Sequence, residues 1–310
     1  MPPVVNSLPS LAPDSNSSRI LIMGHSRRRP RFGRGGGPAA AQGQNAAMSL
    51  PVPSFTHPEA LHREQADDAA ALLRSQGFAR LAPDALAHLS HQPLSALGAL
   101  APAWNDLPPD AHLKDGGRYR RRRHGSLVQD VGAATLDSVP HRAHWQPTTY
   151  NALHGGMLRW FDPLSAQLAQ SPAFLDVVRR LGEVFAAAAH PTDSEPAFDG
   201  RWFVEAHAFR IDTTGGVGRP TPEGAHRDGV NFVAVLLVDR VGVVGGETRV
   251  FAADGPLGVR FTLDEPWSAL LLDDVRVIHE STPIQPAAPG GHRDTLVLTY
   301  RAGGFQDPPK

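Results

Sequence analysis

The stretch that decides the fold is Pro222-Glu-Gly-Ala-His-Arg-Asp-Gly-Val230, which contains the motif His226-Arg227-Asp228. On an extended backbone the side chains of residues i and i+2 point to the same face, so the imidazole of His226 and the carboxylate of Asp228 can reach one point. A His-x-Asp motif alone occurs by chance in many proteins. Its interpretation as half of a metal site therefore depends on the residues around it.

A third ligand is available downstream. His279 ends the segment Arg276-Val-Ile-His279, shortly after the apolar run Leu270-Leu-Leu272. Two histidines and one carboxylate form the facial triad of non-haem iron(II) oxygenases. Three ligands on one face leave the opposite face of the metal open for a bidentate oxoacid and dioxygen. We therefore predict that His226, Asp228 and His279 hold iron(II).

A second signal lies fourteen residues after His279, where Arg293-Asp-Thr295 opens the alternating segment that continues to Tyr300. On a strand, Arg293 and Thr295 share a face. A guanidinium can bind a carboxylate through two hydrogen bonds, and a neighbouring hydroxyl adds another donor. The pair is thus expected to hold the distal carboxylate of an oxoacid whose other end chelates the iron.

The sequence around these motifs changes character near residue 200. Earlier segments show a helical pattern, which predicts helices over about 57–78 and 83–100 and a third that begins at Ser171-Pro172. In the third, the apolar residues recur at intervals of three and four: Phe174, Val178, Leu181, Phe185 and Ala188. Later segments are short and β-rich, at 204–211, 232–238, 247–251, 268–272 and 295–300. Helices followed by many strands predict an α+β fold with a sheet-built core.

Composition limits the class of protein. The 310 residues carry a net charge of −1, so no global field favours nucleic acid or a membrane as partner. Cysteine is absent, which excludes disulfides, thiolate metal sites, iron–sulfur clusters and a cysteine nucleophile. No stretch approaches the roughly 20 apolar residues that span a bilayer. The apolar piece Arg19–Met23 is shorter than the about 7–15 residues of a signal peptide's core, so we expect a cytoplasmic protein.

The first residues differ from the rest. Residues 1–47 are rich in Pro, Ser, Gly, Ala and Arg and show no period of 2 or 3.6. They are predicted to form a disordered basic tail, because they cannot bury enough surface to offset the entropy of ordering. Residues 48–310 are expected to form one domain, with helical support over about 57–190 and a strand core over about 200–301.

As an ordered set, the motifs resemble the 2-oxoglutarate/iron dioxygenases that include bacterial free L-amino-acid hydroxylases such as isoleucine 4-hydroxylase. The resemblance covers about residues 115–305. It rests on Gly117-Arg-Tyr-Arg-Arg121, His154-Gly-Gly156, Val204-Glu-Ala-His207 with Arg210, the segment 222–230, Gly245-Gly-Glu-Thr248, Asp273-Asp-Val-Arg-Val-Ile-His279 and Arg293-Asp-Thr-Leu-Val297. It implies a double-stranded β-helix, or jelly roll, whose metal-ligand strands open at one mouth. It also implies iron(II), 2-oxoglutarate and dioxygen as requirements. A carboxylate at Asp228 favours hydroxylation, because in related halogenases a small residue at this place admits a halide.

Four further residues are weaker candidates for contacts to substrate or cosubstrate. The run Arg118–Arg123 could be a solvated edge, a clamp for a substrate carboxylate or a nucleic-acid contact, and Arg121 is the candidate for the clamp. Glu205 and His207 share a strand face that could look into the barrel. Glu205 could hold an ammonium group, and His207 could contact 2-oxoglutarate or substrate or be a core histidine. Arg210 is the next candidate for an oxoacid contact.

Three functions remain open from the sequence. We predict a hydroxylase that acts on a free L-amino acid or similar small polar molecule and converts 2-oxoglutarate to succinate. The second possibility is the same oxygenase chemistry on a protein, RNA or carrier-bound residue. The third is a non-catalytic cupin-like module that binds a metal, which the expected oxoacid clamp at Arg293 disfavours.

Overall fold

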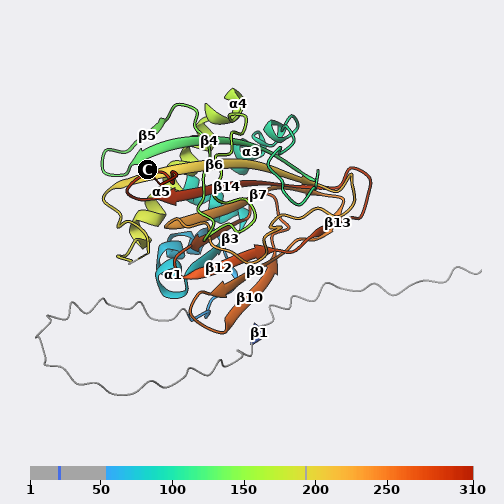
Figure 1. Cartoon of the computed structure of the whole chain (residues 1–310). Helices are drawn as coiled ribbons and strands as arrows, with labels where there is room; N and C mark the ends of the chain where they lie inside the picture. Colours follow the sequence, from blue (N-terminus) through green and yellow to red (C-terminus); the bar gives the residue numbers. More distant parts are fainter. Residues whose placement is uncertain (1–19, 22–53, 193, 310) are drawn as a thin grey trace, which may run out of the picture.

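The computed structural model describes residues 20–21, 54–192 and 194–309, and the described part is built around one large sheet (Figure 1). Its eight strands are, in spatial order, β2 (Ala60–Leu61), β3 (Phe78–Leu81), β11 (Ala269–Asp273), β7 (Phe232–Val241), β14 (His292–Arg301), β6 (Arg201–Asp212), β4 (Arg120–Asp130) and β5 (Thr135–Ser138). All neighbours pair antiparallel except β2 and β3.

A smaller sheet faces the large one. It contains β1 (Ile20–Leu21), β10 (Leu257–Thr262), β9 (Glu247–Ala252) and β12 (Val277–Ser281), while β13 (Ile284–Pro286) and β8 (Val243–Gly245) form a separate pair. Buried side chains fill the space between the sheets. This part of the core joins residues of the large sheet (Val233, Leu237, Leu270 and Leu272) to residues of the smaller one (Val250, Ala252, Val259 and Val277). The two facing sheets form the predicted jelly roll of an α+β protein, which confirms the fold class.

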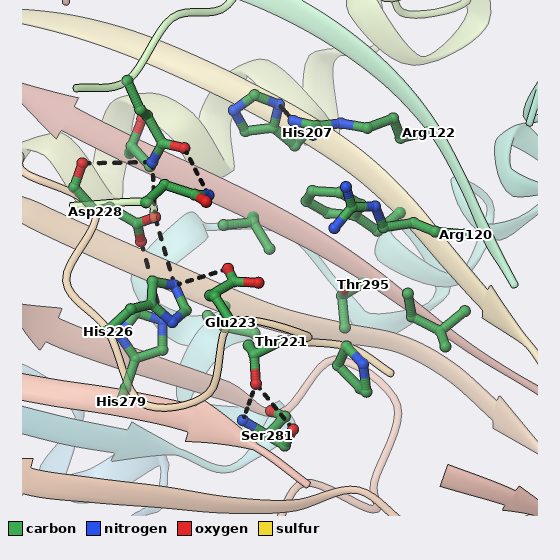
Figure 2. Close-up of a pocket in the computed structure, with 18 of the residues that line it drawn as sticks. Arg120, Arg122, His207, Thr221, Glu223, His226, Asp228, His279, Ser281 and Thr295 are labelled. Carbon is green, nitrogen blue, oxygen red and sulfur yellow. Dashed lines mark hydrogen bonds and ion pairs between the residues drawn. The ribbon is translucent and has the colours of Figure 1, made fainter. Parts of the chain in front are cut away.

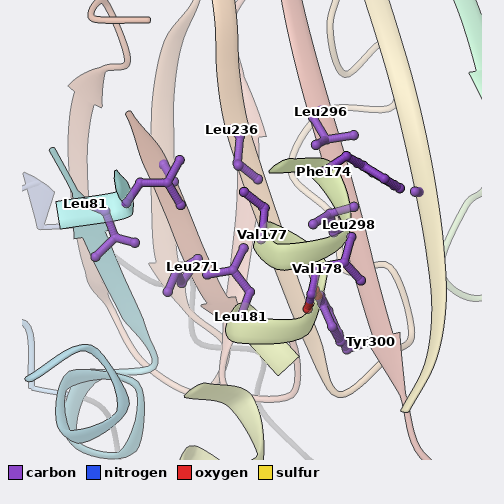
Figure 3. Close-up of a cluster of buried hydrophobic side chains, with 14 of the residues drawn as sticks. Leu81, Phe174, Val177, Val178, Leu181, Leu236, Leu271, Leu296, Leu298 and Tyr300 are labelled. Carbon is purple, nitrogen blue, oxygen red and sulfur yellow. The ribbon is translucent and has the colours of Figure 1, made fainter. Parts of the chain in front are cut away.

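Helices cover the other face of the large sheet. They are η1 (Arg63–Asp68), α1 (Ala69–Gln76), α2 (Pro83–Ser90), α3 (Leu94–Gly98), η2 (Ala101–Trp104), α4 (Ala166–Ala169) and α5 (Pro172–Ala188). The predicted apolar stripe of α5 is buried against the sheet. Figure 3 shows Phe174, Val178 and Leu181 directed at the strand residues Leu236, Leu271, Leu296, Leu298 and Tyr300. Pro172 takes the first helical turn as expected, although the Ser171 side chain makes no capping hydrogen bond.

The predicted helical support over 57–190 is interrupted by strands. Gly77 ends α1 with a φ of 82°, and the chain then enters β3. The helix predicted over 83–100 breaks where His91 adopts a φ of 56°, and Pro93 precedes α3. The eleven-residue β4 joins the large sheet. Its inward positions carry arginine and histidine instead of apolar residues, so the period of hydrophobicity that identifies a strand is absent.

Two residues of the predicted tail, Ile20–Leu21, form β1 and pair with β10. The other residues of 1–47 and the boundary at residue 48 lie outside the described residues, so the predicted tail and domain limits stay predictions. No helix of the described part is long and apolar enough to cross a membrane.

Candidate active site

The loop between β6 and β7 brings His226 and Asp228 to His279 on β12. A two-way backbone bridge joins the histidines, with each N–H donating to the other residue's carbonyl at 3.0 Å. The Oδ1 atom of Asp228 lies 3.7 Å from His226 Nε2, and its Oδ2 atom lies 3.9 Å from His279 Nε2. One donor atom from each of the three side chains lies within 4.8 Å of the others. Figure 2 shows the three converging at one end of a pocket.

Asp274 holds the backbone of this loop in place. Its buried carboxylate accepts hydrogen bonds from the backbone N–H groups of Asp228 (3.0 Å), Gly229 (2.8 Å) and Val230 (3.2 Å). Burial and the nearby charge of Asp228 raise the pKa of the Asp274 carboxyl. Gly229 is required for a close approach, because its φ is 75° and an added Cβ would lie 2.2 Å from the Tyr150 ring. Asp274 therefore supports the ligand loop by holding the loop's backbone.

A hydrogen bond orients one of the two imidazoles. His226 Nδ1 donates to the carbonyl of Gly224 at 3.0 Å, so Nε2, which lies beside Asp228, is the nitrogen left for a metal. Burial, reinforced by the charge of His226, keeps the pKa of His279 well below its usual value, which favours the neutral ring that a metal requires. Gln146 Nε2 donates to Asp228 Oδ1 at 3.2 Å. Two imidazoles and a carboxylate are a donor set that suits iron(II).

Arg293 and Thr295 point from β14 into the same pocket. Arg293 is only 3% exposed, and its Nε and Nη2 atoms have no hydrogen-bond partner among the described residues. Burial, and secondarily the charge of Arg240, lowers the pKa of Arg293 to about 10, so the guanidinium stays cationic near neutral pH. A buried cation with free donors is costly unless an anion binds it. This geometry fits the carboxylate end of 2-oxoglutarate.

A second cationic wall is formed by Arg120 and Arg122 on β4 and by Arg159 from the loop that precedes α4. The three residues are 6%, 4% and 2% exposed. Arg120 Nε donates to the buried Asp110 at 2.7 Å, while Arg120 Nη2, Arg122 Nε and Arg159 Nε have no partner in the described part of the chain. The wall thus has donors to spare for an anionic ligand.

Arg121 was the wrong choice within this run. The alternation predicted for a strand holds, but Arg121 lies on the face away from the pocket, where its side chain is 44% exposed and its Nε donates to Asp212 at 3.4 Å. Arg210 also points outward. Its guanidinium binds both oxygens of Asp294, at 2.8 and 2.7 Å, so its assignment to the oxoacid is wrong as well.

His207 lines the pocket, whereas Glu205 does not. His207 Nδ1 accepts a hydrogen bond from Arg122 Nη2 at 2.7 Å, so its Nε2 carries the proton. Both oxygens of Glu205 are used, by His124 Nε2 at 3.1 Å and His144 Nδ1 at 2.9 Å. Glu205 therefore has no free oxygen aimed at the pocket for a substrate ammonium.

The spacing of His124, His144, Glu205 and His207 would also allow a metal ion. The hydrogen bonds within this group already engage the carboxylate and His207 Nδ1. Arg142 Nη1 lies 3.7 Å from Glu205 Oε1, and the Arg122 guanidinium contacts His207. Two guanidinium charges at such short range oppose the entry of a cation. We infer that this group is a hydrogen-bond network and that the metal belongs at His226, Asp228 and His279.

Sequence reasoning missed several residues that line the pocket. Glu223 stands inside the quoted segment 222–230, yet nothing in the pattern distinguishes it from a turn residue. Arg159 and Gln146 come from a long loop without periodicity. Arg120 and Arg122 had a signal in the strand alternation, but the sequence did not show which face turns inward.

The pocket has the lining of a small-molecule site, and its cavity volume is about 120 Å³. Apolar side chains complete the lining between the charged groups: Phe209, Ile211, Val235 and Val297. A few charged groups among apolar walls are typical of a site that binds a small polar molecule.

The comparisons with known proteins agree with this chemistry. The sequence model of a family described as 2OG-Fe dioxygenase matches residues 101–299. The chain is similar to the crystal structure of a bsmA homolog from Methylobium petroleophilum PM1, with 56% identity over 84% of this chain and 100% of that chain and a TM-score of 0.74. No curated protein matches the chain.

Two more distant structures share the fold. IDO from Bacillus thuringiensis is 17% identical over 81% of this chain and 100% of its own, with a TM-score of 0.62. The Fe(II)/α-ketoglutarate-dependent dioxygenase TqaL is 19% identical over 77% of this chain and 88% of its own, with a TM-score of 0.58. At these identities the similarity shows a common fold alone.

Proposed function

The chain belongs to the 2OG-Fe dioxygenase family, and we propose that it hydroxylates a free L-amino acid or a similar small polar molecule in the pocket described above. Membership makes it an enzyme that requires iron(II), 2-oxoglutarate and dioxygen. We further propose His226, Asp228 and His279 as the iron ligands and Arg293 with Thr295 as the clamp for the distal carboxylate of 2-oxoglutarate.

One feature of the pocket supports these assignments above all: a buried guanidinium with free donors lines the same cavity as two imidazoles and a carboxylate. A site that held only a metal would have no use for the desolvated charge of Arg293. A 2-oxoglutarate molecule offers a keto-acid end to the metal and a carboxylate end to Arg293. One bound 2-oxoglutarate would therefore account for both the metal-binding side chains and the buried guanidinium of Arg293.

The residues divide the work of the reaction. Bound iron and 2-oxoglutarate supply the activation of dioxygen for oxidation of a C–H bond, with release of succinate and carbon dioxide. The triad fixes the metal, and Gln146 orients the Asp228 carboxylate through its 3.2 Å hydrogen bond. Phe209, Val235 and Val297 give the pocket apolar walls. The remaining polar groups hold the substrate so that one C–H bond faces the metal.

The cationic wall supports a substrate with a free carboxylate. Arg120, Arg122 and Arg159 leave donors unsatisfied, and Asp110 is the one carboxylate that contacts the wall in the described residues. A terminal carboxylate can satisfy charged donors that a peptide amide cannot. This favours a free acid over an internal residue of a protein.

A screen of free amino acids tests the proposal. The enzyme with iron(II) and 2-oxoglutarate is incubated with each L-amino acid and with its amide and N-acetyl derivative, and succinate and hydroxylated product are measured. We expect a free amino acid to stimulate succinate formation, and we expect the amide to lose most of this effect. Arg122→Leu should impair use of the amino acid, whereas Arg121→Ala, on the outer face, should not. Equal hydroxylation of a peptide or of the amide would refute the small-molecule function.

A further inference from the structure

We propose that Glu223 is a specificity-determining residue that binds the amino group of the substrate next to the iron. This inference rests on the proposed function and specifies it, because it assigns the two charged ends of the substrate to opposite parts of the pocket. The carboxylate lies at the wall of Arg120, Arg122 and Arg159, and the ammonium lies at Glu223.

The first observation is the state of the Glu223 carboxylate. Its Oε2 atom is buried and has no hydrogen-bond partner among the described residues. Its Oε1 atom lies 3.8 Å from His226 Nε2, the nitrogen assigned to iron. Figure 2 shows the carboxylate in the centre of the pocket, between the triad and the arginines of β4. A buried anionic oxygen without a donor is unfavourable unless a ligand supplies one.

The second observation is that the other acidic groups near the pocket already have partners. Asp228 belongs to the triad, and Asp110 contacts Arg120 and Arg122. Glu205 accepts hydrogen bonds on both oxygens from His124 and His144. Among the acidic residues that line the pocket in the described chain, Glu223 alone combines a free oxygen with no assigned role. It therefore takes the part that the sequence had suggested for Glu205.

The third observation is that Glu223 stands on a fixed support. The Thr221 hydroxyl donates to the Ser281 carbonyl at 3.0 Å and accepts from the Ser281 N–H at 3.1 Å. His226 Nδ1 binds the carbonyl of Gly224 at 3.0 Å. The segment that carries Glu223 is thus tied to β12 on one side and to a metal ligand on the other. A fixed anion beside the metal can position an ammonium group, not merely attract it.

This arrangement predicts how the enzyme selects its substrate. A site that pairs a buried carboxylate with an ammonium rejects analogues that lack the charge, since the carboxylate would then stay desolvated and unpaired. N-acylated amino acids are excluded by both loss of charge and bulk. The des-amino acids keep the contact to the arginine wall and lose only the contact to Glu223.

Calorimetric titration under anaerobic conditions tests the inference on the full chain loaded with iron(II) and 2-oxoglutarate. The probes are L-leucine, L-isoleucine, L-valine and L-methionine, with 4-methylpentanoate and N-acetyl-L-leucine as analogues that lack the ammonium. The variant is Glu223→Gln, and the matched control is Glu280→Gln, on β12 next to His279 but paired with Arg249. We expect Glu223→Gln to weaken binding of the amino acid by about 10- to 100-fold, the range for one charged hydrogen bond. Its affinity for the des-amino analogue should stay unchanged, as should the affinities of the control.

The outcomes separate this inference from the proposed function. If the wild type binds an amino acid and Glu223→Gln binds it equally well, Glu223 has no role in recognition and only the inference fails. If Glu223→Gln instead loses affinity for iron(II), measured by titration without substrate, Glu223 is a metal ligand and the inference is again overturned. If the wild type binds iron(II) and 2-oxoglutarate but neither these four nor any other L-amino acid of the screen above, the proposed substrate class fails, and the role of Glu223 fails with it.

Discussion

Replacement of Arg293 by leucine should have opposite effects on cosubstrate use and on stability. In the ligand-free protein the guanidinium is buried, cationic and without partners for Nε and Nη2. Leucine fills much of the space and removes the desolvated charge. If Arg293 binds 2-oxoglutarate as proposed, the same change also removes two charged hydrogen bonds to the distal carboxylate of the cosubstrate.

The magnitudes follow from these contacts. A charged hydrogen bond contributes about 1.5–3 kcal/mol, so two contribute about 3–6 kcal/mol. At about 1.4 kcal/mol for each factor of ten, the half-saturating concentration of 2-oxoglutarate should rise about 10²- to 10⁴-fold. The ligand-free variant should gain about 1–3 kcal/mol in free energy of unfolding, because replacing an unpaired buried ion with an apolar group is stabilising. For a domain of this size the melting temperature should rise about 2–4 °C for each kcal/mol.

Two assays measure these effects. Succinate formation against 2-oxoglutarate concentration gives the first, and thermal unfolding with and without 2-oxoglutarate gives the second. Wild-type protein should gain stability when 2-oxoglutarate is added, and the variant should gain little. Arg210→Leu is the matched control, since that arginine lies on the neighbouring strand but points outward to Asp294. The control should lose stability and keep its 2-oxoglutarate dependence.

A particular pair of results would refute the role of Arg293. If Arg293→Leu melts at a lower temperature than the wild type and its 2-oxoglutarate dependence is unchanged, the guanidinium is a structural cation, and the cosubstrate clamp lies elsewhere.

Four further predictions concern other parts of the protein. His226→Ala, Asp228→Ala and His279→Ala should each abolish turnover and the weak visible band of the anaerobic iron(II)–2-oxoglutarate complex, and full activity in Asp228→Ala would contradict the ligand set. Thr295→Val should raise the 2-oxoglutarate requirement at most about tenfold, because it removes one neutral donor worth about 0.5–1.5 kcal/mol; a larger effect than that of Arg293→Leu would reverse their assigned importance. Burial lowers the pKa of His144 from 6.5 to about 4. Between these pH values the unfolded chain therefore binds more protons at this residue than the folded chain does. The free energy of unfolding should fall by about 3 kcal/mol through this group as the pH drops from 6.5 to 4. Denaturant titrations should show a flatter pH dependence in His144→Asn, and an identical slope would show that His144 is not buried as a neutral ring. Deletion of residues 1–47 should leave turnover nearly unchanged and should lower the melting temperature only slightly, since it removes the two-residue pairing of β1 with β10; a loss of several degrees would show that the segment contributes more to stability than this short pairing.

The sequence was most informative where the spacing of apolar residues matches the repeat of the helix or strand and so marks its buried side. The stripe of α5 repeats every three to four residues because one side of the helix packs on the sheet, and the structure buries that side. The strands β7, β11 and β14 were likewise visible, since their residues are β-branched or apolar. The i and i+2 rule placed His226 with Asp228 and Arg293 with Thr295, and both pairs line one pocket. His279 joins them through its backbone bridge to His226, which the sequence does not show.

The sequence did not show which face of a strand is buried when that face carries charged residues. On β4 the inward residues include Arg120, Arg122 and His124, so the hydrophobic alternation that normally marks the buried side is absent. Sequence alone could divide the arginines between two faces but could not orient them, and it selected Arg121. Glu205 was similarly placed on the inward face, but its partners His124 and His144 lie 81 and 61 positions away in the chain, beyond any local pattern.

The backbone bridge between His226 and His279, together with the three hydrogen bonds to Asp274, holds the proposed iron ligands in one hydrogen-bonded frame. The ligand residues are then already in place before iron binds, so metal binding costs little conformational entropy. A chelator should be able to strip the metal without melting the jelly roll, and the empty protein should take up iron again in the cold. In a cell that is short of iron, such a protein would stay folded without the metal and would regain activity when iron becomes available.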